Sequence, residues 1–319
     1  MVRLCSFLLL FLISWHTQAQ KIDNLVSYRN MGTQHYFRFN YENDFFAATD
    51  ENYTQGYSFE YVSEALKKNP ANQLFFKLKG FSSIFGIALE HIGYTPNDYV
   101  SREIQNGDRP FASAIFLKSF STANNEKHMY RFSQSLSLGI IGAAALGKEM
   151  QVEIHKWTGN KIPRGWEHQI KNDLVLNYRL DCEKQFFRWN NFLTLNASSS
   201  VQLGTLFTNA AAGANMQLGL LENTSTSSGK KSKFRIYFYG EGISRFIGYD
   251  ATLQGGMLNR SSPYVISSRD VSRIVGQINY GLVLKTGPVY LEYARTTITR
   301  EFKTGNPAGW GGIKVGVGF

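Results

Sequence analysis

The feature that most constrains the fold of this chain is an alternation of apolar and polar residues that recurs along nearly its whole length. In the segment 35–44 (HYFRFNYEND), Phe37 and Phe39 would lie on one face of an extended strand, and Arg38 and Asn40 on the opposite face. A period of two residues is typical of a β-strand with one apolar and one polar face. The chain is therefore predicted to be an all-β protein.

The alternation occurs in twelve segments, some of which show it strongly and others more weakly. The strong ones are 35–44, 57–62, 174–180, 234–246 and 289–302, and the weaker ones are 83–94, 110–121, 128–141, 190–204, 211–222, 271–285 and 311–319. Strands of roughly 9–11 residues are long enough to cross a bilayer at a tilt. A transmembrane barrel would turn the apolar faces outward, whereas a soluble sandwich or lipocalin-like barrel would turn them inward.

Aromatic residues and the C-terminal segment favour the membrane barrel. Tyr, Phe and Trp make up 14% of the chain and occur near the ends of predicted strands, where aromatic girdles lie. The chain ends in GGIKVGVGF, with Ile313, Val315, Val317 and Phe319 on one face. A final strand that ends in Phe resembles the signal recognised by the barrel assembly machinery of bacterial outer membranes. We therefore predict a twelve-stranded antiparallel transmembrane β-barrel in the outer membrane of a bacterial cell.

Residues 1–20 (MVRLCSFLLLFLISWHTQAQ) have the three regions of a secretory signal peptide. Arg3 supplies the positive charge, residues 7–13 the apolar core and TQA the small-residue cleavage site. A membrane anchor is the alternative, but the apolar core is too short to span a bilayer and no basic stop follows it. We predict a cleaved signal peptide at 1–19 and a single barrel domain at 20–319.

Composition and charge narrow the function classes. After residue 20 no apolar run approaches the roughly 20 residues of a membrane helix, which excludes a multi-helix membrane protein. The net charge of +10 is compatible with simple solubility or with an anionic partner such as a phosphorylated lipid. The chain has no run of Lys or Arg and no nucleic-acid motif, and it is exported, so we expect no nucleic-acid partner.

One segment, 143–158, departs from the period of two and is predicted to be a short helix in a loop or against the barrel rim. Leu146, Met150 and Ile154 form an apolar stripe on this helix. Gln151 and His155, which are four residues apart, project together from the adjacent face.

A hydrolytic site could be built from polar residues at the strand ends and on this helix. Hydrolysis needs an activated water and a cation or dipole for the developing oxyanion. His155 is a candidate base, Gln151 a positioning group, and the oxygens of Asn43 and Asp44 suit a hard cation such as calcium. A strand-end Asn-Asp is more often turn chemistry, and a helical His more often packs, so the residues alone leave both interpretations open. No EF-hand, His-Glu-x-x-His or Gly-x-Ser-x-Gly motif is present.

Four stretches, 41–61, 106–113, 148–172 and 292–305, together resemble the outer-membrane lipid A 3′-O-deacylase family in their order and spacing. The likeness covers nearly the whole chain after the signal peptide. It implies a twelve-stranded barrel with a site near the outer-leaflet rim, between the wall and a loop helix. It also implies calcium as cofactor and removal of the 3′-linked acyloxyacyl group of lipid A.

The resemblance also assigns roles to individual residues. Asn43 and Asp44 match the family's Asn-Asp at the end of the first strand, Thr54 matches its Tyr-Thr motif, and Gln151 and His155 match its helix pair. His155 would take a proton from water, and calcium would polarise the ester carbonyl. Asp44 and Asn43 would hold the cation or orient the substrate.

The chain departs from the family pattern at two positions. Lys161 stands six residues after His155, at a position where the family pattern has an acidic residue. The lack of that acidic residue could weaken the binding of the metal. Nearby acidic residues could substitute for it: Glu149, Glu153 and Glu167. Arg102 is the nearest candidate for a basic, substrate-binding residue of the family. The motif at 107–109 (Gly-Asp-Arg) is interpreted as structural, with a buried Asp-Arg pair that shapes a turn.

The predicted function is therefore a carboxylic ester hydrolase, a lipid A deacylase of the outer membrane. Its partners would be lipid A or lipopolysaccharide, outer-membrane lipids and the barrel assembly machinery, and we expect a monomer. One alternative is a non-catalytic barrel that binds glycolipid or passes small solutes. Another is a phospholipase with a Ser nucleophile, but the sequence has no Ser-His pair at a recognisable spacing.

Overall fold

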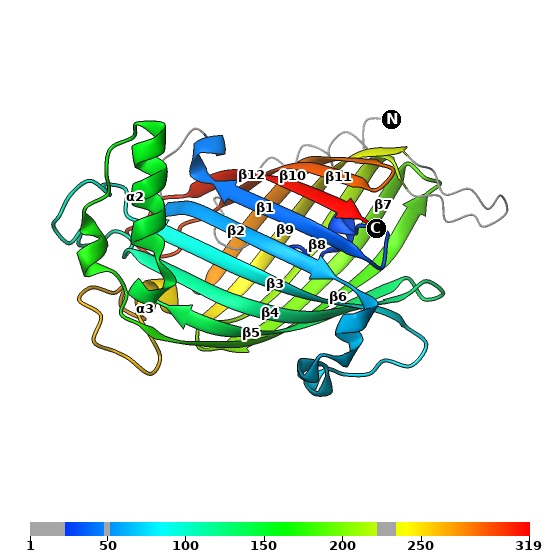
Figure 1. Cartoon of the computed structure of the whole chain (residues 1–319), viewed down its shortest axis with the longest axis horizontal. Coiled ribbons are helices and arrows are strands. Elements are labelled where there is room, and N and C mark those ends of the chain that lie inside the picture. Colours follow the sequence, from blue (N-terminus) through cyan, green and yellow to red (C-terminus); the bar gives the residue numbers. More distant parts are fainter. Residues whose placement is uncertain (1–22, 48–51, 222–233) are drawn as a thin grey trace, which may run out of the picture.

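The alternating segments pair edge to edge in chain order until the first strand meets the last and closes a barrel (Figure 1). The computed structural model describes residues 23–47, 52–221 and 234–319. The strands are β1 Tyr36–Asn43, β2 Asn52–Val62, β3 Ser82–Thr95, β4 Ala112–Asn125, β5 Tyr130–Ile141, β6 Asp173–Trp189, β7 Leu193–Gly204, β8 Phe207–Leu220, β9 Phe234–Asp250, β10 Ile274–Thr286, β11 Val289–Ile298 and β12 Ala308–Gly318. All pairings are antiparallel, so the predicted twelve-stranded barrel is confirmed. The predicted signal peptide lies outside the described residues.

Several strands extend beyond the predicted segments, and β2 and β6 extend the furthest. β2 begins at Asn52 rather than at residue 57, and β6 continues to Trp189 rather than ending at residue 180. Each has a register shift in its added part, between Asn52 and Gln55 in β2 and between Gln185 and Phe187 in β6. A bulge inserts an extra residue, so it breaks the period of two while the strand continues.

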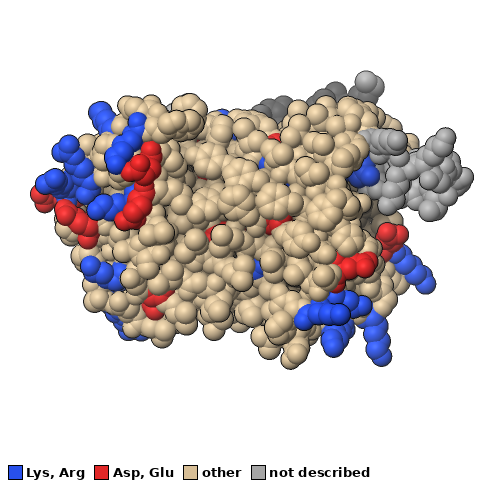
Figure 2. All heavy atoms as spheres, in the orientation of Figure 1, with Lys and Arg blue, Asp and Glu red and all other residues tan. Residues whose placement is uncertain are grey.

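The alternation places apolar side chains on the outside of the barrel. Phe37 and Phe59 are each 43% exposed, whereas Arg38 and Glu60, their neighbours in the chain, are buried inside. The predicted C-terminal face is confirmed as well, because Ile313 and its partners along β12 are exposed. Figure 2 shows the result: charged side chains gather at the two ends, and the wall between them is almost free of charge. An apolar outer belt is what a barrel needs in a bilayer.

The two ends of the barrel differ in their connections. One end, here called the loop end, carries residues 44–47, the short turn 205–206 and the long loops 96–111, 142–172, 251–273 and 299–307. The other, here called the terminal end, carries the C-terminus and the connection between β2 and β3. Helix α2 (Gly147–Thr158) lies across the loop end (Figure 1).

The segment 23–31 enters the barrel lumen, which the sequence analysis did not predict. Its short 3-10 helix η2 (Ser27–Arg29) is almost entirely buried. The Tyr28 hydroxyl donates to Glu241 on β9, and Arg29 forms a 2.8 Å ion pair with Glu292 on β11. The segment therefore fills the lumen from the side of the terminal end.

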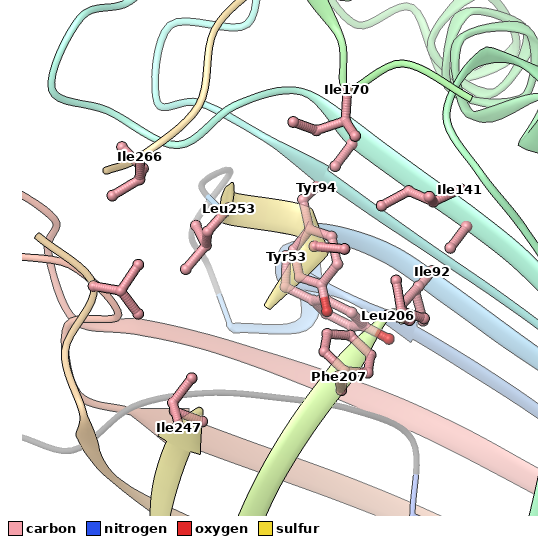
Figure 3. Close-up of a cluster of buried hydrophobic side chains, with 14 of the residues drawn as sticks. Tyr53, Ile92, Tyr94, Ile141, Ile170, Leu206, Phe207, Ile247, Leu253 and Ile266 are labelled. Atoms are coloured by element: carbon pink, nitrogen blue, oxygen red, sulfur yellow. The ribbon is translucent and has the colours of Figure 1, made fainter. Parts of the chain in front are cut away.

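Two apolar clusters lie inside the barrel, one toward each end. On β3, Ile92 belongs to the cluster at the loop end and Ala88 to the cluster at the terminal end, with Glu90 between them. Figure 3 shows the loop-end cluster, to which both strands and loops contribute side chains. Between the clusters, Glu90 on β3 pairs with Lys118 on β4, and Lys314 on β12 pairs with Glu42 on β1, so buried ion pairs line the lumen between neighbouring strands. The described lumen is packed rather than open.

The predicted helix at 143–158 forms in two parts. Residues Ala143–Ala145 form the 3-10 helix η6, and α2 begins at Gly147. Leu146 separates them with a φ of 61°, a left-handed conformation that ends one helix before the next begins. Among the described residues, none of the helices is both long and apolar enough to cross a membrane.

Candidate functional site

Helix α2 is held against the outer surface of the barrel wall. A Cβ atom at Gly147 would lie 2.4 Å from the Cβ of Ser113 on β4, so only glycine permits this contact. Just before α2, the Ala145 carbonyl lies 3.1 Å from Nε2 of His91 on β3. A third apolar cluster, Tyr99, Phe111 and Trp166, packs beside the helix. These contacts fix the position of the side chains that α2 carries.

His155 lies on the buried face of α2 and is held through one ring nitrogen. Its Nδ1 lies 2.6 Å from the Lys161 carbonyl, and the edge of its ring meets Tyr99 at a centroid distance of 5.4 Å. Within the described part of the chain, Nε2 has no hydrogen-bond partner. Since a carbonyl only accepts, Nδ1 carries the proton and Nε2 keeps its lone pair. His155 can therefore act as a base at Nε2.

The contact with His155 gives Lys161 a role that does not depend on its side chain. The carbonyl that orients the imidazole belongs to the backbone, and the Lys161 side chain is exposed. A basic residue in place of an acidic one therefore leaves this contact intact. The predicted substitutes for the missing carboxylate are exposed, and Glu153 is paired with Lys156 at 2.6 Å.

Gln151 lies one turn before His155 and is almost completely buried. Its Oε1 accepts a 2.7 Å hydrogen bond from the Trp166 indole. Its Nε2 is buried and has no partner among the described residues. The amide is therefore oriented through its oxygen and presents a donor beside His155.

Asn43 and Asp44 lie where β1 passes into the 3-10 helix η3 (Asp44–Ala47). The Asn43 amide donates to the Thr54 carbonyl at 2.6 Å and accepts from the Phe45 amide at 2.8 Å. It thereby ties the end of β1 to the start of β2. Asp44 is 2% exposed. The turn role that the sequence left open is thus present for Asn43, next to a buried carboxylate.

Thr54 belongs to the irregular part of β2 and is buried. Its hydroxyl lies 2.5 Å from the hydroxyl of Thr95 at the end of β3. Two hydroxyls and the Asn43 amide therefore lie close together at the rim. Thr95 was not singled out in the sequence, because its partner becomes apparent only from the strand register.

The structure brings the predicted residues to the same end of the barrel in two groups, Asn43, Asp44 and Thr54 on the wall, and Gln151 and His155 on α2. The loop 96–111 connects them, because it starts after Thr95 and reaches His155 through Tyr99.

His91 and Gln55 are buried polar residues that the sequence analysis missed. His91 lies on the outward face of β3, stacks on Tyr57 at a centroid distance of 5.0 Å and uses Nε2 to contact Ala145. Its Nδ1 and the Nε2 of Gln55 are buried without partners in the described residues. A polar residue at an outward position of a membrane barrel, where apolar residues are the rule, was the signal that could have revealed His91.

Arg102 and the motif at 107–109 occupy the loop beside the site. Arg102 is exposed, which leaves its guanidinium accessible to an anion. Arg109 is buried and pairs with Glu301 and with the Thr252 hydroxyl, so the predicted pair with Asp108 is wrong. Asp108 instead accepts from the backbone of the same loop. Burial lowers the pKa of the Arg109 guanidinium, and nearby phenol and carboxylate groups oppose this.

The oxygen atoms around Asp44 suit calcium in kind. Calcium accepts carboxylate, amide, carbonyl and hydroxyl oxygens together with water. Asp44, Asn43 and Thr54 supply a carboxylate, an amide and a hydroxyl at the rim. Across residues 23–47, 52–221 and 234–319, no cluster of three His, Cys, Asp or Glu suited to a metal is found. The donors therefore fit a hard cation with few carboxylates rather than a zinc-type centre.

Fold and site together define an outer-membrane β-barrel with a polar site between a loop helix and the outer wall at its rim. Over residues 4–319 the sequence matches the family described as outer membrane protein LpxR, and the chain belongs to this family. The expected family and the bacterial outer-membrane location are thereby confirmed.

One solved structure supports this fold. LpxR from Salmonella typhimurium is similar, with a TM-score of 0.71 and 18% sequence identity over 89% of this chain and 100% of that chain. The β domain of the Bordetella autotransporter BrkA has a TM-score of 0.45 at 9% identity, over 90% of this chain and 100% of that one. The latter value is too low to support an argument. No curated protein matches the chain.

Proposed function

We propose that this protein is a calcium-dependent outer-membrane esterase that removes the 3′-acyloxyacyl group of lipid A with water activated by His155. Membership of the LpxR family and the outer-membrane barrel support a lipid A deacylase. The observation that carries the proposal is the state of His155, whose Nδ1 is fixed by the Lys161 carbonyl while Nε2 remains available.

The proposed reaction is a general-base hydrolysis. Nε2 of His155 accepts a proton from water as the water oxygen bonds to the ester carbonyl carbon. The bond from that carbon to the sugar oxygen then breaks, and the imidazolium returns the proton to the leaving oxygen. The products are a free fatty acid that keeps its own acyl substituent and a sugar hydroxyl, so atoms and protons balance.

Gln151 and nearby basic residues support the same substrate class. The free Nε2 of Gln151 can donate to the carbonyl oxygen as negative charge develops there. Arg102, Lys161 and Arg164 are exposed on the two loops that contact His155, and the Arg164 amide donates to the Tyr99 carbonyl. Three cationic side chains near a base suit a substrate that carries phosphate.

Calcium would be held by Asp44 with help from Asn43 and Thr54. Bound there, it would polarise the ester carbonyl. The burial of Asp44 and the two hydroxyls at Thr54 and Thr95 support this assignment. Carbonyl groups, water or the substrate would complete the coordination.

The experiment that tests the proposal is mass spectrometry of lipid A from cells that express this chain, with and without a calcium chelator. We expect loss of the mass of a 3′-acyloxyacyl group, prevented by the chelator and by His155→Ala. The matched control is His168→Ala, which removes another histidine from the same loop. An unchanged lipid A spectrum from correctly inserted wild-type protein would contradict the proposed reaction.

The alternative of a barrel that passes small solutes gains no support from the described lumen. Segment 23–31 crosses it, and a cavity beside Asp23 and Arg179 has a volume of about 30 Å³. That volume holds roughly two water molecules. A solute would have to displace buried ion pairs to pass.

A further inference from the structure

Helix α2 carries an apolar stripe that is strongly exposed at its two ends and partly exposed between them. The stripe consists of Leu146, Met150, Ile154 and Trp157, which lie three or four residues apart and so share one side of the helix. Leu146 is 56% exposed and Trp157 is 87% exposed. The sequence predicts a stripe of Leu146, Met150 and Ile154. The structure leaves Met150 and Ile154 partly exposed and adds Trp157 to the stripe.

The side of α2 that faces the barrel is different. It carries Gln151 and His155, which are buried, and it borders the apolar stripe. The remaining side is charged, with Lys148, Glu149, Glu153 and Lys156. A helix with one apolar and one charged side in addition to its docking face is the pattern of a helix in a membrane interface.

An exposed aromatic residue also lies beside the site residues on the barrel wall, Asn43, Asp44 and Thr54. Phe45 follows Asp44 directly in η3 and is 78% exposed. Its backbone amide donates to the Asn43 side chain, so the position of the ring is tied to that of the site residues. Each half of the candidate site therefore has a large exposed apolar side chain next to it.

The apolar stripe continues the lipid-facing surface of the barrel. Leu138 near the loop end of β5 is 57% exposed, and Leu174 at the start of β6 is 47% exposed. Strand β5 leads through η6 directly into α2, so the exposed apolar surface extends from the wall onto the helix. Since the wall lies in the outer membrane, lipid is the occupant that this continuity indicates.

We propose that the apolar stripe of α2 and Phe45 contact the acyl chains of outer-leaflet lipids, with the charged side of α2 at the headgroups. The helix then holds Gln151 and His155 at the level where acyl chains meet headgroups. An ester at that depth reaches His155 sideways from the membrane plane. This last step rests on the proposed function, whereas the lipid contact does not.

Trp157 supplies a direct test of the lipid contact. The purified wild-type barrel and the Trp157→Phe variant are placed in phosphatidylcholine vesicles, and the difference between their emission spectra isolates Trp157. Trp166 and Trp310 are buried, and Trp189 lies at the terminal end, so Trp189→Phe is the matched control. We expect phosphatidylcholine brominated on its acyl chains to quench the difference emission and aqueous iodide to leave it nearly unchanged. Quenching by iodide and not by brominated lipid would overturn the proposal.

A second measurement tests the consequence for activity. Trp157→Asp should cause a several-fold loss of hydrolysis for lipid A in vesicles and a smaller loss for lipid A in detergent micelles, where the plane of the membrane is absent. Lys303→Ala, which changes an exposed charge at the loop end outside α2, should leave both rates near wild type. If Trp157→Asp lowered the rate of hydrolysis equally in vesicles and in micelles, sideways entry of the substrate would be contradicted. If the wild-type protein hydrolyses no lipid A, the proposed function fails, but the fluorescence result still decides the lipid contact.

Discussion

Buried polar groups are treated differently in the lumen and at the loop-end rim. In the lumen, several charged groups on segment 23–31 and on the strands meet groups of opposite charge, as in the pairs Arg29–Glu292 and Arg38–Glu60. At the rim, three buried amide or imidazole side chains are each held through one polar atom. His155, Gln151 and His91 all leave their second polar atom without a partner in the described protein.

This difference indicates that the buried polar groups of the lumen have a structural role, whereas those of the rim are available for function. An ion pair in the lumen matches two opposite charges, even where an atom such as Nε of Arg38 or Oε2 of Glu60 has no further partner in the described residues. A side chain with one polar atom in a hydrogen bond is held in a fixed orientation, and its second polar atom can still donate to or accept from a ligand. The rim is therefore where a substrate or cation would find partners, and the predictions below compare the two regions.

The largest effect is expected for His155→Ala. Loss of a general base should lower the rate of deacylation by about 10²–10⁴-fold. The barrel should stay folded, because His155 contributes one hydrogen bond at the rim. Timed release of fatty acid measures the rate, and heat-modifiable migration on a gel reports the fold. Activity at the wild-type level would exclude His155 as the base.

Arg29→Ala should have the opposite effects, a large loss of stability and little loss of activity. It leaves Glu292 buried without its cation, which should lower the free energy of unfolding by about 3–5 kcal/mol. Deacylation by the fraction that remains folded should be close to wild type. Urea unfolding followed by fluorescence measures the first, and activity per folded molecule the second. A large loss of activity in the folded fraction would show that the two regions are coupled.

Gly147→Val tests how far the site depends on the docking of α2. The new side chain would collide with Ser113 and Trp166, so α2 should move away from the wall. A displacement of about 1 Å can cost roughly 10²-fold in rate. Gly242→Ala is the control, since a Cβ there meets no atom within 4 Å. The expected loss of activity should occur without a change in the urea midpoint of the barrel, and unaltered activity would mean that α2 tolerates the shift.

The smallest effect is expected for Lys303→Ala. Lys303 pairs with Asp270 at 3.0 Å on the surface of the loop end, where both side chains are about half exposed or more. Exposed pairs contribute about 0–1 kcal/mol. When urea unfolding of Lys303→Ala and Arg29→Ala is measured side by side, the free energy of unfolding should therefore fall much less for Lys303→Ala than for Arg29→Ala. Comparable shifts would contradict the view that burial distinguishes these ion pairs.

Most of the fold follows from the sequence, because a period of two records which face of each strand is buried. The prediction becomes less accurate where a bulge adds a residue, as at the start of β2, since the alternation then changes phase. It also cannot show that segment 23–31 fills the lumen. The partners of Arg29 lie on strands more than two hundred residues away, and no local pattern records such a pairing.

The candidate site could be predicted only in part, for a similar reason. The spacing of Gln151 and His155 on one helix is visible in the sequence, whereas the carbonyl that orients His155 belongs to a loop whose course is set by packing. His91 and Thr95 come to the rim through the register of β2 and β3. The Asp-Arg pair predicted within 107–109 was wrong because Arg109 finds Glu301 in a distant loop.

The position of segment 23–31 has a consequence for the order of assembly. It contacts β1, β5, β6, β9 and β11, which come from both halves of the chain. Those contacts cannot all exist until the strands are in register, although the segment precedes every strand in the sequence. The first described residues of the chain therefore gain their full set of contacts only after strands from both halves of the chain have come together.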